Sequence, residues 1–474
     1  MTVSSTAGID TFRDPAGSLR VEGDRVKRRV RVNHARAALS FLASDLARQW
    51  VSQGLMVATT TLGEGALQFD SVLDEDEEIV LEHPRVFFPS YPWEWTPGAW
   101  IAAGNLTLDL CESLLGKALI LKDATPLNVL FEGAKPVFVD VLSIDKRDPE
   151  SPIWLAYAQF VRTFLLPLIA HRYLGWPLAA SLQRRDGYEP ADLYPYLGSA
   201  QRWRQPFRSL VTIPYLLEKK RTAAATAAPR IRQSPEIAEA VLRSHLRRLR
   251  KMLNRLAPAE RASRWSDYPE SAGHYSNQDH QQKQAFVRRA LQFSEPRNVL
   301  DLGANTGVYS RIAASMGASV VAWDTDLAAT ERNWAQARAE KWPIQPLLVD
   351  PARPTPPAGW RNSESLGLLD RAHRNFDCVM ALGLIHHLLI ADQIPLSEVA
   401  RLFRDLTRAW AIVEWVPATD PRFADLVRGR DDLYGHLSEE DFLAAMRPLF
   451  SIAMSEKLAN GRTLYLFQVD SSRG

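Results

Sequence analysis

Residues 298–307 read NVLDLGANTG, and this stretch decides the fold of the C-terminal part of the chain. The apolar run through Leu302 predicts a buried strand, Gly303 and Gly307 predict a sharp turn, and the following VYSRIAASMGA has helical spacing. Glycines let a ligand approach the main chain, and the start of a helix offers free N–H donors. The stretch therefore predicts a strand–turn–helix unit whose turn binds a ligand.

Alternating strands and helices continue from this unit to the C-terminus. Further strands are expected at 319–324, 346–350, 376–382 and 409–414, with a helix at about 327–341. Such alternation predicts a Rossmann-like α/β fold with a parallel sheet. The last two strands, at about 450–455 and 463–469, are joined by Ala459-Asn-Gly-Arg462, and Asn-Gly is a strong hairpin signal. The sheet is therefore expected to close with an antiparallel pair.

Acidic residues at the strand ends narrow the choice of ligand. Asp324 ends the second strand about 20 residues after the turn, where it can accept hydrogen bonds from ribose hydroxyls, and Asp350 ends the third. A dinucleotide fingerprint requires glycine at positions 305 and 308, which are Asn305 and Val308. An adenosyl group without phosphates fits better, and asparagine adopts left-handed backbone geometry more readily than most residues.

With these motifs the chain resembles the class I S-adenosylmethionine-dependent methyltransferases. The matching segments between residues 268 and 470 are VLDLGANTG, VVAWD, LLVD, FDCVMALGLIHHL and IVEW, followed by the closing hairpin. The resemblance implies S-adenosyl-L-methionine as cofactor. No metal site is expected, because the sequence has neither a C-x-x-C motif nor a Cys/His cluster. The resemblance implies that Asp324 holds the ribose and Asp350 the adenine. It also implies contacts to the methionine end or nearby from Asp301, Gly303, Ala304, Asn305, Gly307 and Leu382. Tyr275 and Lys283 resemble the lead-in helix over the cofactor.

The catalytic candidates follow the fourth and fifth strands. His386 and His387 lie at the carboxyl end of the fourth strand, where ligands of open α/β sheets bind, and Glu414 ends the fifth. A base is needed if the acceptor is a hydroxyl or a protonated amine. Either histidine could be that base, or could cap or pack against the following helix. Glu414 could contact the acceptor directly, or could support the residues that do. Because helical neighbours diverge by about 100°, only one histidine is expected to point inward.

The N-terminal part carries a second pattern, LKDATPLNVLF at residues 121–131 followed by Asp140. It resembles the catalytic and metal loops of kinase-like phosphotransferases. Asp123 would position an acceptor hydroxyl, and Asn128 and Asp140 would hold magnesium. Leu121 replaces the usual histidine, and no glycine-rich loop precedes the segment. A degenerate kinase-like α+β domain used for recognition is therefore favoured over active phosphotransfer.

A spacer and a long helix separate the two parts. Three regions are expected: a recognition domain at 1–220, a linker with a basic amphipathic helix at 221–265, and a methyltransferase domain at 266–474. Ser234 and Pro235 predict the start of the helix. Its apolar stripe consists of Ile237, Val241, Leu242, Leu246, Leu249, Leu253 and Leu256, and its basic face of Arg243, Arg247, Arg248, Arg250, Lys251 and Arg255. A solvated face is the favoured interpretation, since this helix lacks the aromatic residues that stack on bases.

Composition sets outer limits on function. The net charge of +2 argues against a protein that coats polyanions, and two cysteines cannot build a disulfide framework. The N-terminus lacks an apolar signal core, and no apolar run approaches the ~20 residues of a membrane helix. A cytoplasmic protein without a membrane partner is expected; the sequence does not indicate its oligomeric state.

The whole chain is similar to bacterial two-part methyltransferases, some of them host-specific nodulation proteins. The resemblance rests on SYPWEW (90–95), the loop at 121–144, WLAYAQF (154–160) and the final RTLYLFQ (462–468). It implies methyl transfer to an O or N atom of an unidentified acceptor, a small molecule or glycan. The alternatives are a nucleic-acid or protein methyltransferase that uses the basic helix, a nicotinamide-dependent oxidoreductase, and a non-catalytic pseudokinase-type scaffold.

Overall fold

A computed structural model describes residues 17–62, 78–220, 231–258, 277–427 and 437–470. The chain forms two compact units. Unit 1 spans residues 1–131, 136–259 and 358–365, and unit 2 spans 132–135, 260–357 and 366–474. Tyr275 and part of the expected linker, 221–230, lie outside the described residues.

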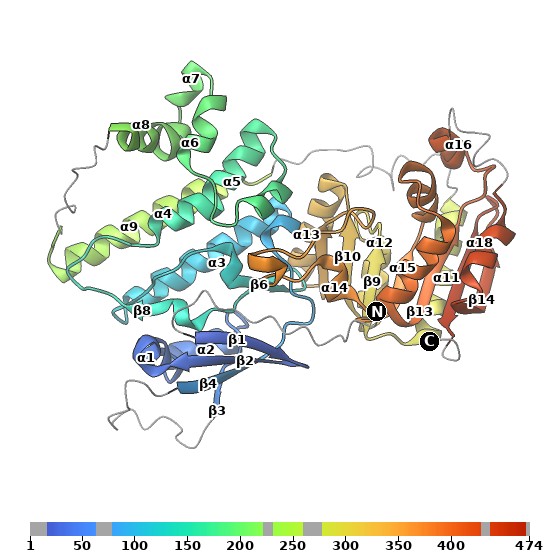
Figure 1. Cartoon of the computed structure of the whole chain (residues 1–474), viewed down its shortest axis with the longest axis horizontal. Helices are drawn as coiled ribbons and strands as arrows, with labels where there is room; N and C mark the ends of the chain where they lie inside the picture. The colour runs from blue at the N-terminus through green and yellow to red at the C-terminus, as the bar shows by residue number, and fades with distance from the viewer. Residues whose placement is uncertain (1–16, 63–77, 221–230, 259–276, 428–436, 471–474) are drawn as a thin grey trace. The chain divides into compact units, whose positions relative to one another are not determined.

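Unit 2 is a mixed α/β structure around a seven-stranded sheet (Figure 1). Its strands are β9 (Asn298–Leu302), β10 (Ser319–Asp324), β11 (Ile344–Leu348), β12 (Phe376–Ala381), β13 (Thr407–Trp415), β14 (Phe450–Lys457) and β15 (Thr463–Val469). Their order is β11-β10-β9-β12-β13-β15-β14. The first five strands are parallel, and β15 pairs antiparallel with both β13 and β14. The parallel sheet and its closing hairpin confirm the fold expected for this part of the chain.

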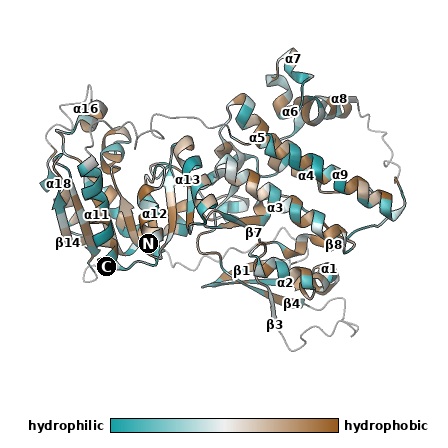
Figure 2. Cartoon of the chain, turned by 180° about the vertical axis from the view of Figure 1, so that it is seen from behind, coloured by the Kyte–Doolittle hydropathy of each residue, from teal (hydrophilic) through white to brown (hydrophobic). Residues whose placement is uncertain are grey.

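The parallel strands form because they are apolar on both faces. Four of the five residues of β9 are buried. All residues of β12 are buried except Asp377, which is half-buried. Strands buried on both sides by helices read as continuous apolar runs. Figure 2 shows hydrophobic colouring along the central strands, whereas the surrounding helices mix both colours.

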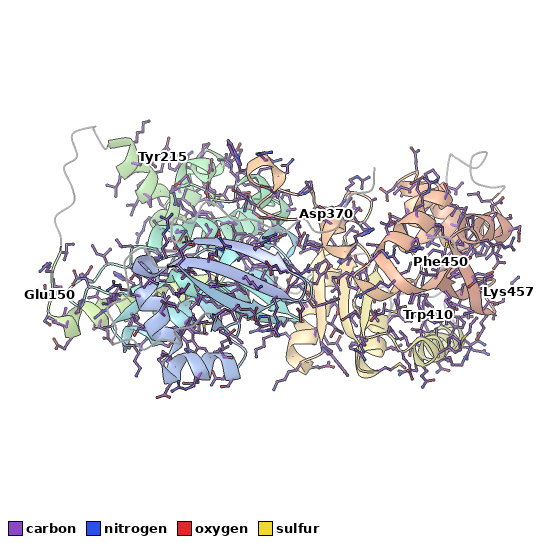
Figure 3. The ribbon with its side chains drawn as sticks, turned by 60° about the horizontal axis from the view of Figure 1, so that its bottom comes forward. Glu150, Tyr215, Asp370, Trp410, Phe450 and Lys457 are labelled. Atoms are coloured by element: carbon purple, nitrogen blue, oxygen red, sulfur yellow. The ribbon has the colours of Figure 1, made fainter. Side chains whose placement is uncertain are left out.

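The described helices of unit 2 are α11 (Asn277–Ser294), α12 (Val308–Ser315), α13 (Leu327–Glu340), α14 (Leu368–Ala372), η10 (His387–Ala391), α15 (Leu396–Leu406), α16 (Pro421–Val427) and α18 (Glu439–Met446). The short η9 (Trp360–Asn362) belongs to unit 1. The pairs α11 and α12, and α15 and α18, pack side by side, and α13 packs on β10 and β11. Figure 3 labels Trp410 of β13 and the two ends of β14, Phe450 and Lys457.

The third parallel strand differs from its expected position. The sequence suggested 346–350, but β11 ends at Leu348, so Asp350 lies two residues beyond the strand. Residues 346–349 (PLLV) are all apolar, so the sequence does not indicate at which of them the strand ends. Pairing with β10 stops because β10 itself ends at Asp324, opposite Leu348.

Unit 1 is α+β. Its strands are β1 (Gly17–Glu22), β2 (Arg25–Arg31), β3 (Thr60–Leu62), β4 (Glu78–Pro84), β5 (Leu119–Leu121), β6 (Val129–Glu132), β7 (Lys135–Phe138) and β8 (Ile144–Lys146). Its longer helices are α1 (Val32–Leu42), α2 (Asp45–Ser52), α3 (Pro97–Leu115), α8 (Ile213–Lys220) and α9 (Pro235–Asn254). The first four strands form one antiparallel sheet in the order β1-β2-β4-β3.

Helix α9 belongs to unit 1, where it packs along α3. Ser234 caps its start by accepting a hydrogen bond from the backbone N–H of Ile237 at 3.5 Å, and Pro235 takes the first position. The stripe from Leu242 to Leu253 is buried, but Ile237 is 53% exposed, so its assignment to the stripe was wrong. Ile237 lies in the first turn of the helix.

Candidate functional site

The turn between β9 and α12 contains three residues with positive φ. Gly303, Asn305 and Gly307 have φ values of +68°, +51° and +80°. Asparagine at 305 therefore adopts the conformation that the sequence suggested for it. The backbone N–H groups of Gly303 and Ala304 both donate to the carbonyl of Trp323 on β10, at 2.9 and 3.0 Å.

Asp324 ties this turn to the second strand. Its Oδ2 accepts a hydrogen bond from the backbone N–H of Asn305 at 2.7 Å, and its Oδ1 accepts one from Asp326 at 2.8 Å. Burial raises the pKa of the Asp324 carboxyl, although these two hydrogen bonds oppose the shift. Asp324 is half-buried, and the two hydrogen bonds fix the orientation of its carboxylate. We call Asp324 and residues 303–307 the cradle.

Asp301 lies beneath the cradle and is 2% exposed. Ser310 of α12 donates a hydrogen bond to its Oδ2 at 2.6 Å. Burial raises the pKa of Asp301 to about 7, and the nearby Asp324 adds to this effect. Asp301 therefore anchors the first turn of α12 under the cradle from a fully buried position.

The two glycines of the cradle are required for different reasons. A Cβ on Gly307 would lie 2.1 Å from the side-chain oxygen of Asn333 on α13, a residue that is 1% exposed. Gly307 is thus the point at which α13 approaches the turn. A Cβ on Gly303 would meet only Leu384, at 3.4 Å, so its requirement comes from its positive φ.

Asp350 lies beside the end of β11, with its carboxylate engaged locally. Its Oδ1 accepts from the backbone N–H of Ala352 and its Oδ2 from Arg353, both at 2.8 Å. Arg353 also pairs with Asp392 at 2.7 Å. Leu382, directly after β12, is half-buried.

The two histidines begin the short helix η10 after β12. His386 is 4% exposed and His387 is half-buried, and their ring centroids are 4.3 Å apart. Because the two residues differ in burial, the expectation that only one of them points into the cleft stays a prediction. His386 has right-handed helical backbone geometry and immediately precedes η10, which begins at His387.

Glu414 is fully buried at the end of β13 and accepts from two cations. Lys283 of α11 reaches its Oε2 at 2.6 Å, and Arg462 reaches its Oε1 at 3.2 Å. Arg462 also pairs with Asp420 at 2.7 Å. Neither Arg462 nor Asp420 was singled out from the sequence. Arg462 directly follows the Asn-Gly hairpin turn. Asp420 lies in the loop after β13, the strand that contains Glu414, and its position after this strand is the sequence feature that could have drawn attention to it.

The kinase-like loop of unit 1 is internally hydrogen-bonded. Asp140 pairs with Arg28 of β2 and accepts from Ser143, which in turn accepts from Asn128 at 2.9 Å. Burial raises the pKa of Asp140, but Arg28 and Ser143 outweigh it and lower the pKa overall. Asp123 is half-buried in the same loop. Both carboxylate oxygens of Asp140 thus serve unit 1 itself.

The basic face of α9 is partly engaged by acids. Arg243, Arg247 and Arg250 contact Glu112 of α3, and Arg250 also contacts Asp109. Half of the basic residues named from the sequence therefore serve helix packing within unit 1.

Over the residues that the structure describes, no group of three or more His, Cys, Asp and Glu side chains is arranged to hold a metal ion. In the same ranges, no helix combines the length and apolarity needed to cross a bilayer.

The sheet order and the cradle define an α/β unit of the Rossmann-like type. No known family model matches the chain. The chain is 27% identical over 463 residues to the nodulation protein NoeA of Rhizobium meliloti (strain 1021), a match that covers 97% of this chain and 95% of that protein. The resemblance to bacterial nodulation proteins drawn from the sequence is thereby confirmed.

Solved structures resemble part of the chain. Magnesium protoporphyrin IX methyltransferase (ChlM) from Synechocystis PCC 6803, with bound SAH, is 18% identical, with a TM-score of 0.31, over 43% of this chain and 97% of that one. The N-methyltransferase NodS from Bradyrhizobium japonicum WM9, in complex with S-adenosyl-L-homocysteine, is 14% identical, with a TM-score of 0.31, over 41% of this chain and 90% of that one.

Proposed function

We propose that the chain is an enzyme that transfers a methyl group from S-adenosyl-L-methionine and that the cradle of unit 2 binds this cofactor. The observation that carries the proposal is the hydrogen bond from Asn305 to Asp324, because it joins the glycine turn and the ribose-type acid of the second strand into one preformed surface. Asp324 holds the ribose, residues 301–307 hold the methionine end, and Leu382 and Asp350 contact the adenine.

The donor set of the cradle suits an adenosyl group better than a dinucleotide. Asn305 and Val308 stand where a pyrophosphate turn needs glycine. A half-buried carboxylate that is already oriented by two backbone N–H groups is suited to a pair of ribose hydroxyls. When bound, the cofactor supplies a methyl group on a sulfonium, which is a good leaving group, so that alignment of the acceptor carries much of the catalysis.

The acceptor is proposed to be a hydroxyl or an amine of a small molecule or glycan. The two histidines after β12 offer imidazoles to take up the proton that such an acceptor loses. Unit 1 is proposed to be a recognition unit with a kinase-like fold and without phosphotransfer. We also propose that the chain is divided into a recognition domain at 1–220, a linker with the basic helix at 221–265 and a methyltransferase domain at 266–474. A cytoplasmic location is a further part of the proposal.

Calorimetry with the full chain tests the cofactor assignment. S-adenosylmethionine is expected to bind and NADH is not. Asp324→Ala is expected to weaken binding by about ten-fold or more, since a hydrogen bond to a charged group contributes about 1.5–3 kcal/mol. Asp405→Ala is the control, because Asp405 is exposed on α15. Unchanged affinity in Asp324→Ala, or tighter binding of NADH, would overturn the proposal.

A further inference from the structure

Four buried charges of alternating sign form a chain at the carboxyl end of the sheet. Lys283, Glu414, Arg462 and Asp420 are 6%, 0%, 3% and 6% exposed. They are linked in that order by contacts of 2.6, 3.2 and 2.7 Å. Each comes from a different segment: α11, the end of β13, the turn before β15 and the loop before α16. We call these four residues the ionic chain.

The ionic chain occupies both oxygens of Glu414. Lys283 approaches Oε2 and Arg462 approaches Oε1. On the strand side, a Cβ added to Gly383 would lie 3.5 Å from Oε2, so the main chain after β12 also closes on this carboxylate. A carboxylate that is enclosed in this way is stabilised in its ionised form by a cation on each oxygen, so a proton from an acceptor would have to compete with these cations.

The histidine pair lies beside the ionic chain and is differently placed. The Nδ1 atom of His386 is buried and has no hydrogen-bond partner in the part of the chain that the structure describes. The charged or titratable groups that face His386 are His387, Arg462, Glu414 and Lys283. Burial is the main cause that holds the pKa of His386 well below its ordinary value, and His387 and the two cations act in the same direction. His387, half-buried, gives the pair access from outside.

We propose that Lys283 and Arg462 are positioning residues of the methyltransferase site: by taking both oxygens of Glu414 they withdraw this acid from proton transfer and leave the His386–His387 pair as the proton acceptor. This inference rests on the proposed function. It divides the three candidates named from the sequence into one acid that organises the site and two imidazoles that exchange protons with the acceptor.

Histidine-selective NMR of the full chain tests the division without knowledge of the acceptor. The ring resonance of His386, assigned with His386→Gln, is followed against pH in the wild type, Lys283→Met and Arg462→Met. Each variant removes a cation near the imidazole, and a nearby cation disfavours the protonated ring. In both variants, the pH at the midpoint of the His386 titration is expected to rise by about half a pH unit or more. Arg289→Met is the matched control, since Arg289 lies on the same helix as Lys283 in an exposed ion pair with Glu456.

A second measurement follows the acid itself. The side-chain carboxyl resonance of Glu414, assigned with Glu414→Gln, is expected to remain that of an ionised group throughout the range in which the imidazoles titrate. Lys283→Met/Glu414→Gln is expected to melt above either single variant, because it removes a buried charge together with its partner. The melting temperatures show whether each variant is folded under the conditions in which its titration is followed.

Two results would overturn the proposal: an unchanged midpoint of His386 in folded Lys283→Met and Arg462→Met, or protonation of Glu414 while His386 is still neutral. Calorimetry with S-adenosylmethionine on the same samples separates this failure from a failure of the proposed function. If the wild type binds the cofactor and either result is found, only the assignment of roles to Glu414 and the histidines is contradicted, and the proposed function stands.

Discussion

At the scale of single residues, the cradle depends on a glycine whose importance comes from packing. Gly307 combines a left-handed backbone with a contact at which any side chain would meet the buried Asn333 of α13. The first feature can be guessed from the pattern GANTG, but the second cannot. The turn that we propose to bind the cofactor and a helix-packing contact therefore share one position.

Gly307→Ala is expected to destabilise unit 2 in two ways. A left-handed non-glycine residue costs about 1–2 kcal/mol, and overpacking against Asn333 adds about 1–3 kcal/mol. Gly317→Ala isolates the first contribution, since Gly317 has φ +92° and nothing lies within 4 Å of its added Cβ. Urea unfolding of both variants measures the difference. Equal losses would show that Asn333 yields to the new side chain and that packing does not require Gly307.

Asp301 predicts a pH dependence of stability. Burial raises its pKa to about 7, from an ordinary value of 3.8. The folded state then binds more protons than the unfolded state between about pH 4 and 7, so this group's contribution to stability falls as pH rises through that range and is level above it. The full loss corresponds to about 4 kcal/mol, at 1.36 kcal/mol per pH unit.

Asp301→Asn is therefore expected to gain stability relative to the wild type as pH rises from about 4 to 7. The measurement is the difference in unfolding free energy between the two proteins at several pH values. Ser310→Ala serves as control, because it removes the hydrogen bond to Asp301 while leaving the titrating group in place. A difference that is constant with pH would contradict a raised pKa for Asp301.

At the scale of elements, α9 shows how an amphipathic pattern becomes a packed helix. Its apolar stripe faces α3, and a Cβ on Gly104 of α3 would lie 2.7 Å from Leu253, so the two helices are in close contact there. The basic residues at the edges of the stripe pair with Asp109 and Glu112 on the same partner helix. Packing and charge pairing thus bind α9 to unit 1.

Leu253→Ala is expected to destabilise this helix pair by about 2–5 kcal/mol, because it removes a fully buried side chain. Ile237→Ala, on the same helix but 53% exposed, is expected to change stability by less than ~0.5 kcal/mol. Hydrogen exchange of peptides from α3 and α9 measures both effects locally. Similar effects of the two substitutions would mean that the stripe does not pack as described.

The loop around Asp140 predicts the absence of phosphotransfer. Because Arg28 and Ser143 take both carboxylate oxygens, Asp140 is not available as a magnesium ligand without breaking a part-buried ion pair. ATP with magnesium is expected neither to raise the melting temperature nor to be hydrolysed by the wild type. Asp140→Ala is expected to lower the melting temperature. Magnesium-dependent binding of ATP that disappears in Asp140→Ala would disprove this.

At the scale of the whole molecule, each unit contains one buried cysteine. Cys111 lies in α3 of unit 1 and Cys378 in β12 of unit 2, and both are inaccessible. Burial raises the pKa of Cys111 to about 12 and also raises that of Cys378. Thiols in this state react only when their own unit opens.

Thiol labelling can therefore report on each unit separately. Cys111→Ser leaves only Cys378 to react, and Cys378→Ser leaves only Cys111. If the cofactor binds unit 2, S-adenosylmethionine at ten times its dissociation constant is expected to slow labelling of Cys378 by about ten-fold. Labelling of Cys111 is expected to change much less. Slower labelling of Cys111 alone would place the ligand in unit 1.

The sequence by itself determined the sheet of unit 2 and the place of its cradle. The strands at 298–302, 319–324 and 463–469 agree with their predicted limits, because strands covered on both faces need continuous apolar runs that end at acids or turns. The left-handed Asn305 and the Asn-Gly hairpin were also predictable, since both depend on local backbone preferences.

Which charged side chains contact one another became clear only in the folded chain. Lys283 and Glu414 lie far apart in the sequence, as do Arg28 and Asp140, and no pattern within a segment predicts either pair. Their contacts depend on strand order and on how deeply each side chain is buried. Burial decides whether an ion pair organises a site or remains a weak surface contact, because the interaction strengthens as water is excluded. The roles of Glu414 and of the two histidines could for this reason be separated only after the chain was seen folded.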